Sequence, residues 1–305
     1  MKKTFYSNGK LLITGEYLVL DGAKAFALPT KLGQNLTIED GKNQEIQWKS
    51  YDADGTVWFE DTITFTEITH FAVQESDSIR NTLIRILHHA YLQNPDFIHT
   101  SVGYQVHTQL TFSRKWGLGT SSTLINNIAQ WLRIDAFELL NSSFGGSGYD
   151  IACAQNDSAI IYKLENGKPL VEPINFNPEY TNQIYFVYLN RKQSSKTAIA
   201  NYNNNKNQNL ENSISKINSI TEEIIYATSV DYFRNTLERH ETKMSHLLET
   251  CTVKELLFPD FKGTVKSLGA WGGDFVMVVS DKNPADYFFE KGFSVLFPYE
   301  ELILT

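Results

Sequence analysis

The sequence lacks several features that mark specialised classes of protein. Two cysteines, Cys153 and Cys251, occur in the whole chain, too few for a disulfide framework or a cysteine-based zinc site. Their neighbourhoods resemble core segments, so we expect two buried free thiols in a reducing compartment. No apolar run reaches the roughly 18 residues of a membrane-spanning helix. We therefore expect a cytoplasmic protein with no membrane partner.

A secretory signal is not expected either. Lys2 and Lys3 precede the apolar residues 11–13, as they would in a signal peptide. Gly15 and Glu16 interrupt that apolar run too early, and no small-residue cleavage site follows.

Positive charge is also scarce. The 305 residues include 27 Lys and Arg against 35 Asp and Glu, a formal net charge of −8. Nucleic-acid-binding domains carry a basic patch, so this balance argues against a nucleic-acid partner. An anionic small molecule stays compatible, because a local pocket can be basic on an acidic protein. Hydrophobic residues make up 42% of the chain, enough for large cores in about two domains.

Hydrophobic periodicity predicts a mixed α+β fold. A polar connection that contains Pro169, Pro173 and Pro178 suggests a domain boundary, which gives domains over residues 1–178 and 179–305. The expected strands cover residues 11–13, 17–20, 56–66, 102–112, 160–162, 184–189, 265–268, 275–279 and 293–297. Helices are expected over 79–90, 124–132 and 284–290, at Asp150, and twice after residue 209, the second over 233–251.

The segment Trp116-Gly117-Leu118-Gly119-Thr120-Ser121-Ser122 joins an expected strand to an expected helix. Glycines let the backbone approach an anion, and the N–H groups and dipole of a helix start attract it. The hydroxyl groups can bind phosphate or complete a Mg²⁺ shell, which usually takes one or two protein oxygens. No Gly-Lys-Ser/Thr ends the loop, so it is not a Walker A motif. Taken alone, the pattern also fits a helix capped by Ser or Thr.

Three other segments carry residues suited to phosphoryl transfer. Asp150, in Ser147-Gly148-Tyr149-Asp150, can accept a proton from a substrate hydroxyl, or it serves only as a helix cap. Lys10 can balance phosphate charge and lower the pKa of a nearby carboxylate, or it is a solvated lysine at a strand edge. The glycine cluster over 269–274 favours a tight hairpin on turn chemistry alone.

In this order, the four segments resemble motifs of the GHMP kinase superfamily, which includes galactokinase, homoserine kinase, mevalonate kinase and phosphomevalonate kinase. Residues 9–20 are similar to the first family motif, 117–122 to Gly-Leu-Gly-Ser-Ser-Ala, 147–150 to Ser-Gly-x-Asp and 269–274 to the third motif. The Gly-Glu-Tyr at 15–17 and the Gly-Gly-Asp at 272–274 are most similar to phosphomevalonate kinases. Residues 193–196 resemble an Arg-Ser-Thr-Lys stretch on the substrate side of mevalonate-type kinases.

Three features depart from the family pattern, the first being that residues 113–116 lack the proline that often precedes the second motif. Trp271 stands where the family has a small glycine, so the third loop is expected to pack differently. No residue matches the glutamate that helps hold Mg²⁺ in mevalonate kinase, since Glu138 is one position out of register.

The resemblance implies a two-domain GHMP kinase fold, with an S5-like N-terminal ATP-binding domain over 1–178 and a ferredoxin-like C-terminal domain over 179–305. It implies an enzyme that uses ATP and Mg²⁺. Its implied site residues are Asp150 and Lys10 for catalysis; Gly117, Leu118, Gly119, Thr120, Ser121 and Ser122 for ATP; Ser121 for the metal; and Lys10, Glu16, Ser147, Gly148, Ser195, Lys196, Gly272, Gly273 and Asp274 for the substrate.

The implied substrate is a small molecule of the mevalonate pathway. Phosphomevalonate leads on the Gly-Glu-Tyr and Gly-Gly-Asp details, and mevalonate is second. A sugar, homoserine, or a nucleotide-binding sensor without phosphotransfer stays open as an alternative. A homodimer is also left open.

Overall fold

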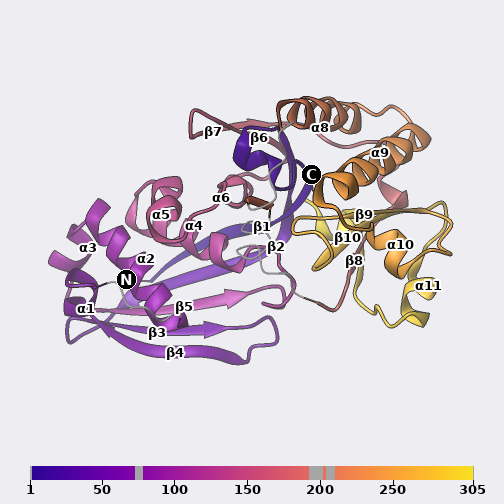
Figure 1. Cartoon of the computed structure of the whole chain (residues 1–305). Coiled ribbons are helices and arrows are strands. Elements are labelled where there is room, and N and C mark those ends of the chain that lie inside the picture. The colour runs from indigo at the N-terminus through magenta and orange to yellow at the C-terminus, as the bar shows by residue number, and fades with distance from the viewer. Residues whose placement is uncertain (1, 73–77, 192–201, 204–209, 305) are drawn as a thin grey trace. The chain divides into compact units, whose positions relative to one another are not determined.

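The computed structural model describes residues 2–72, 78–191, 202–203 and 210–304 (Figure 1). Its internal contacts divide the chain into two compact units. The first unit comprises Met1–Gly9, Leu32–Arg114 and Leu118–Gln155, and the second comprises Lys10–Lys31, Lys115–Gly117 and Asn156–Thr305. No helix among the described residues is long and apolar enough to cross a membrane.

The first unit packs helices against one face of a sheet (Figure 1). Its strands are β4 (Val57–Thr64), β3 (Glu45–Tyr51), β5 (Tyr104–Leu110) and β2 (Ala25–Asp40), in that order. β3 and β5 run parallel and the other neighbours antiparallel. β1 (Lys3–Thr14) pairs with β2, and both strands continue into the second unit. The helices are α1 (Phe65–Thr69), α2 (Ile79–Gln93), α3 (Asp96–His99), α4 (Thr120–Leu132), α5 (Ala136–Ser143) and α6 (Tyr149–Gln155).

Alternation in the strands and helical spacing in α2, α4 and α5 build the core of this unit. In β3, Ile46 and Trp48 are buried, while Gln47 between them is exposed, as the two-residue period of a strand requires. The helices contribute apolar stripes that include Leu87 and Ile128.

The second unit contains a four-stranded antiparallel sheet. Its order is β11 (Leu296–Pro298), β8 (Ile184–Tyr188), β10 (Phe275–Val279) and β9 (Thr264–Ser267). Separately, β6 (Ile160–Glu165) pairs with β2, and β7 (Lys168–Pro173) pairs with β6. The helices are α8 (Leu210–Ile225), α9 (Val230–Leu248), α10 (Val253–Leu257), α11 (Ala285–Glu290) and α12 (Tyr299–Leu302), with 3₁₀ turns η1 (Leu18–Asp21) and η2 (Thr181–Gln183).

Most predicted elements are confirmed, and three predictions are wrong for identifiable reasons. Residues 18–21 form the 3₁₀ turn η1 and not a strand, because Gly15 and Tyr17 adopt positive φ angles of 86° and 58° that turn the chain. The proline-containing connection contains the strand β7, which tolerates proline because it lies at the edge of its sheet. The helix expected to reach Cys251 ends at Leu248, and the Cys251 thiol is exposed.

The contact division also differs from the predicted boundary after residue 178. β6 and β7 precede that boundary, yet they belong to the second unit because β6 pairs with the first part of β2. The functional boundary at 178 stays a prediction.

Candidate functional site

Three of the four motif segments meet in the second unit. Lys10, on β1, donates a hydrogen bond from Nζ to the Gly117 carbonyl oxygen over 3.0 Å. The carboxyl group of Asp274 packs directly on the Cα of Gly117, so that a β-carbon at residue 117 would overlap it. Gly117 also has a φ of +69°, where a side chain is disfavoured. Glycine is therefore required at the point where the first, second and third motifs come together.

The backbone around Gly117 is anchored on the four-stranded sheet. Tyr188, on β8, donates from its hydroxyl to the Lys115 carbonyl oxygen over 3.1 Å. The ring of Trp116 packs edge-on against Phe297 and Phe275, with centroids 5.4 and 6.1 Å apart. Aromatic edge-to-face pairs of this kind add to the stabilisation from burial. Residues 115–117 therefore have a defined place on the sheet.

Asp274 is held by backbone hydrogen bonds on both sides. Its N–H donates to the Arg191 carbonyl oxygen over 2.8 Å, and its carbonyl accepts from the Leu189 N–H over 2.7 Å. Its φ of 51° lies in the left-handed region, which aspartate tolerates better than most residues. β9 and β10 pair antiparallel on either side of this loop, so the predicted hairpin over 269–274 is confirmed.

The helix start in the first unit differs from a Ser- or Thr-capped helix. The N-cap of α4 is Gly119, with a φ of 102°, and no side chain caps the helix. The Ser122 hydroxyl donates back to the Gly119 carbonyl over 2.9 Å. Ser121 is exposed, and its hydroxyl has no hydrogen-bond partner within the described part of the chain. No side-chain cap takes up the first-turn N–H groups of α4, so these groups can donate to an anion.

A buried polar network fixes α4 in its unit. Asn127 accepts from Ser7 over 2.8 Å and donates to the Gln34 carbonyl over 2.9 Å. Thr123 donates to the Gln34 side chain over 2.8 Å. Because buried polar groups that are satisfied specify a unique arrangement, these bonds tie the helix start to β1 and β2.

Asp150 is the second residue of α6, inside the first helical turn. Its side chain is half-buried, and Oδ1 accepts from the Ile151 N–H over 3.1 Å. Helix α6 is joined to α4 by Gln155, which donates to Asn126 over 3.1 Å. Gly148, before the helix, has a φ of +89°. The predicted acid–base group therefore stands on a helix that a hydrogen bond attaches to α4.

Glu16 has a different environment from the one expected of a substrate-binding residue. It is fully buried, and Oε1 accepts from Lys266 Nζ over 2.6 Å. Burial raises the pKa of Glu16 to about 7, against the lowering effect of the Lys266 charge and hydrogen bond. The carboxylate faces the protein interior, so the geometry gives no support to the predicted direct contact with substrate.

This pKa predicts how pH changes the effect of Glu16→Gln on stability. A raised folded-state pKa means that folded Glu16 binds a proton between its unfolded value and about 7, so wild-type stability decreases as pH rises through that interval. Glutamine does not titrate. Relative to wild type, the variant should therefore gain about 2 kcal/mol in unfolding free energy between pH 5 and 8. Denaturant unfolding at both pH values measures this, and a constant difference would contradict it.

Five other predicted positions lie either in the β9–β10 loop or outside the described residues. Trp271, 6% exposed, packs in a cluster with Leu18 and Met244, so the indole points into the protein core. Ser195 and Lys196 lie outside the described residues. Gly272, with a φ of +83°, and Gly273 complete the loop before Asp274.

Sequence reasoning missed Lys266, His240 and Glu241, which surround Glu16. One signal was present in the sequence: a lysine inside an otherwise uncharged predicted strand directly before the third glycine cluster. Lysine is rarely fully buried without a partner, so a lysine at this position indicates a buried carboxylate beside it.

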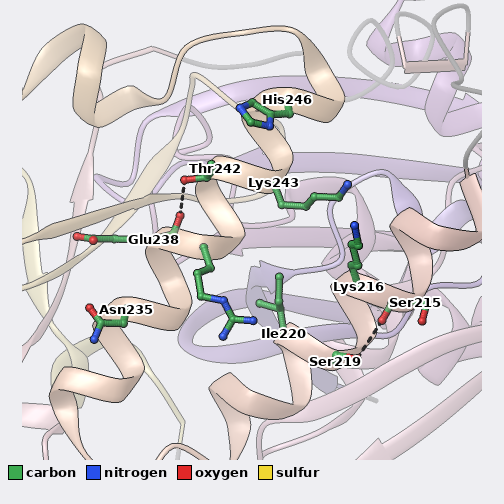
Figure 2. A pocket seen from close by; sticks show the side chains of 10 residues that line it. Ser215, Lys216, Ser219, Ile220, Asn235, Glu238, Thr242, Lys243 and His246 are labelled. Atoms are coloured by element: carbon green, nitrogen blue, oxygen red, sulfur yellow. Dashed lines mark hydrogen bonds between the residues drawn. The ribbon is translucent and has the colours of Figure 1, made fainter.

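A surface groove between α8 and α9 contains none of the predicted site residues (Figure 2). It has a volume of about 720 Å³. The side chains of Lys216 and Lys243 extend toward each other across it, as Figure 2 shows. Among the described residues, no group of three or more His, Cys, Asp or Glu side chains is placed to hold a metal ion.

No protein-family model and no curated protein matches the chain, but solved structures do. The structure is similar to mevalonate kinase of Methanococcus jannaschii, with a TM-score of 0.71, 13% identity, and coverage of 100% of this chain and 99% of that one. For the phosphomevalonate kinase of Streptococcus pneumoniae, in complex with phosphomevalonate and AMPPNP, the values are 0.69, 14%, 97% and 99%. For a D-glycero-D-manno-heptose 1-phosphate kinase from Bacteriodes thetaiotaomicron they are 0.67, 14%, 99% and 96%. The fold predicted from the motifs is thus confirmed over the whole chain.

Proposed function

We propose that this chain, which has the GHMP kinase fold, is a small-molecule kinase. It transfers the γ-phosphoryl group of Mg·ATP to an acceptor of the mevalonate pathway, with phosphomevalonate as the leading candidate. The exposed Cys251 thiol suits a reducing cytoplasm, where free thiols persist.

The observation that carries the proposal is the meeting of motifs at Gly117. Lys10, Gly117 and Asp274 come from three distant parts of the sequence, yet Lys10 Nζ donates to the Gly117 carbonyl oxygen and the Asp274 carboxyl group lies against Gly117. The glycine at this point has a positive φ and allows a neighbouring group to approach the backbone closely.

The residues present fit ATP and Mg²⁺. The first-turn N–H groups of α4 have no side-chain cap, so Thr120, Ser121 and Ser122 would hold phosphate oxygens through the backbone. The exposed Ser121 hydroxyl would supply one protein oxygen to the metal, whose remaining ligands would be phosphate and water. When bound, Mg²⁺ neutralises charge on the β- and γ-phosphates. Leu118 is fully buried and would contribute through its backbone alone.

On the acceptor side, Asp150 would orient the nucleophilic oxygen and take its proton where the acceptor is a hydroxyl. A phosphate acceptor is already largely deprotonated near neutral pH, so Asp150 would then mainly orient it. Lys10 would stabilise charge on the transferring group, while Ser147, Gly148, Gly272, Gly273 and Asp274 would contact the acceptor. In phosphoryl transfer, positioning and electrostatic stabilisation supply most of the rate.

Phosphomevalonate leads because Glu16-Tyr17 and Gly272-Gly273-Asp274 resemble the phosphomevalonate kinase motifs. Mevalonate is second, and sugars or homoserine follow. A nucleotide-binding sensor without phosphotransfer is the alternative from another class. Burial of the Trp271 side chain in the core removes one reason to favour the sensor, since the indole does not fill the loop's outer side.

An ATP-consumption screen tests the proposal. Purified protein with Mg·ATP is offered phosphomevalonate, mevalonate, galactose and homoserine in separate reactions. We expect turnover with phosphomevalonate at a rate typical of enzymes, about 1–100 s⁻¹. Tight ATP binding without turnover on any acceptor would favour the sensor. Turnover on galactose or homoserine alone would retain the kinase and remove the pathway assignment.

A further inference from the structure

A buried ionic cluster of Glu16, His240, Glu241 and Lys266 lies in the second unit. Lys266, on β9, is fully buried, and its Nζ donates to Glu16 Oε1 over 2.6 Å and to the Ser267 carbonyl over 2.7 Å. Glu241, on α9, lies 3.5 Å from the same Nζ and accepts from the Ser267 hydroxyl over 3.0 Å. His240 Nε2 lies 3.3 Å from Glu16 Oε2. The cluster therefore joins three segments that are distant in the sequence.

The chain is strained where Glu16 enters this cluster. Tyr17, the next residue, has φ 58° and ψ −48°, outside the usual regions for a side-chain-bearing residue. Such a conformation costs about 1–3 kcal/mol and persists only where surrounding contacts impose it. Stacking of Tyr17 on Tyr202, at 5.5 Å, and burial of Leu18 supply contacts on one side. The ion pair of Glu16 with Lys266 supplies them on the other.

Stability alone does not account for this arrangement. Desolvation of buried charges can exceed the attraction between them, and apolar residues of similar size often give equal or greater stability. Burial raises the pKa of Glu241 as well as that of Glu16, and holds the pKa of His240 well below its ordinary value. What an ionic cluster adds over an apolar one is a fixed geometry, here set by the hydrogen bonds of Lys266 to Glu16 and Ser267 and of Ser267 to Glu241.

The two ends of that geometry are the motifs themselves. Glu16 lies six residues after Lys10, within the first motif, and Lys266 precedes the glycine loop that ends at Asp274. Lys10 and Asp274 both contact Gly117. The segment from Lys10 to Glu16 and the segment from Lys266 to Asp274 are therefore linked twice. One link is the ion pair of Glu16 with Lys266, and the other passes through Gly117.

We propose that Lys266 is a positioning residue that, through Glu16 and Glu241, fixes where the β9–β10 loop places Asp274 relative to Lys10. Lys266 does not contact substrate, because it is fully buried. The expected effect on Mg·ATP affinity rests on the proposed function, whereas the expected effect on the structure of the loop does not.

Hydrogen exchange on a charge-compensated variant tests the proposal. Lys266→Met combined with Glu241→Gln removes the bridge and one buried carboxylate while it preserves side-chain length. Two amide groups flank the loop: Leu268 N–H donates to the Phe275 carbonyl, and Asp274 N–H donates to the Arg191 carbonyl. We expect both amides to exchange about tenfold or more faster in the double variant, through local opening of the loop. Mg·ATP affinity, measured by calorimetry, should fall with them.

The control is Lys243→Met, a lysine of the same unit in the groove between α8 and α9, which should leave both amides unchanged. If the double variant has the wild-type melting temperature and the two amides keep wild-type exchange, the cluster is only structural and the proposal is wrong. If the double variant does not fold, Glu16→Leu, which removes the acceptor of the Lys266 hydrogen bond, takes its place, and unchanged exchange there overturns the proposal equally. Wild-type protein that does not bind Mg·ATP would defeat the proposed function alone, because the exchange result stands independently.

Discussion

Replacing Gly117 by alanine is expected to lower the unfolding free energy by about 2–4 kcal/mol, the range of substitutions that force buried groups to move. The new β-carbon would overlap the Asp274 carboxyl group, which would have to turn away while backbone hydrogen bonds keep the Asp274 main chain in place. The φ of +69° adds the strain of a left-handed L-residue, about 1–2 kcal/mol. Under the proposed function, ATP turnover should fall to background, since Asp274 and the phosphate loop are displaced together.

The matched control is Gly167→Ala. Gly167 lies in the same unit, has a φ of +75°, and has open space where a β-carbon would stand. This variant carries the left-handed strain without the collision, so it should lose only about 1–2 kcal/mol and keep its turnover. Urea unfolding of both variants measures the difference. Equal losses of unfolding free energy in the two variants would show that the Asp274 side chain moves away at little cost and that the close approach at Gly117 is unimportant.

Replacing Asp150 by asparagine is expected to reduce kcat according to the class of acceptor. For a hydroxyl acceptor the loss should be about 10²–10⁴-fold, the usual contribution of a general base. For a phosphate acceptor such as phosphomevalonate it should be smaller, because no strongly held proton is removed and asparagine still orients an oxygen. Stability should change little, since an amide oxygen can accept the Ile151 N–H bond as Asp150 does.

Steady-state kinetics with mevalonate and phosphomevalonate separates these outcomes. Asp135→Asn is the control, because Asp135 caps α5 in the same unit by accepting from the Phe137 and Glu138 N–H groups. Asparagine caps a helix about as well as aspartate, so this variant should retain wild-type kcat. Undiminished turnover of Asp150→Asn on every acceptor would exclude Asp150 from the mechanism while the kinase assignment remains.

Local chemistry made much of the fold predictable. The helical spacing of Leu83 and Leu87 and the alternation of Val106 and Leu110 are properties of neighbouring residues, and the structure contains both elements. The failures occurred where local preference was overridden. β7 is a strand despite its prolines because it lies at the edge of its sheet. One side of an edge strand has no neighbouring strand, so an N–H group is not needed there. Residues 18–21 turn because of the positive φ angles at Gly15 and Tyr17, which apolar composition does not reveal.

The sequence by itself determined which glycine, lysine, serine and aspartate residues deserved attention, because phosphate chemistry restricts the residue types that can surround an anion. It also determined the α+β fold class, because the hydrophobic periodicity of each helix and strand is visible within a short stretch of sequence. Only the tertiary structure decided that Lys10 and Asp274 meet at Gly117, and that Glu16 pairs with Lys266 in the interior. Contacts between residues more than 100 positions apart, such as that of Lys10 with Gly117, depend on how whole sheets and helices pack, and no local pattern encodes them.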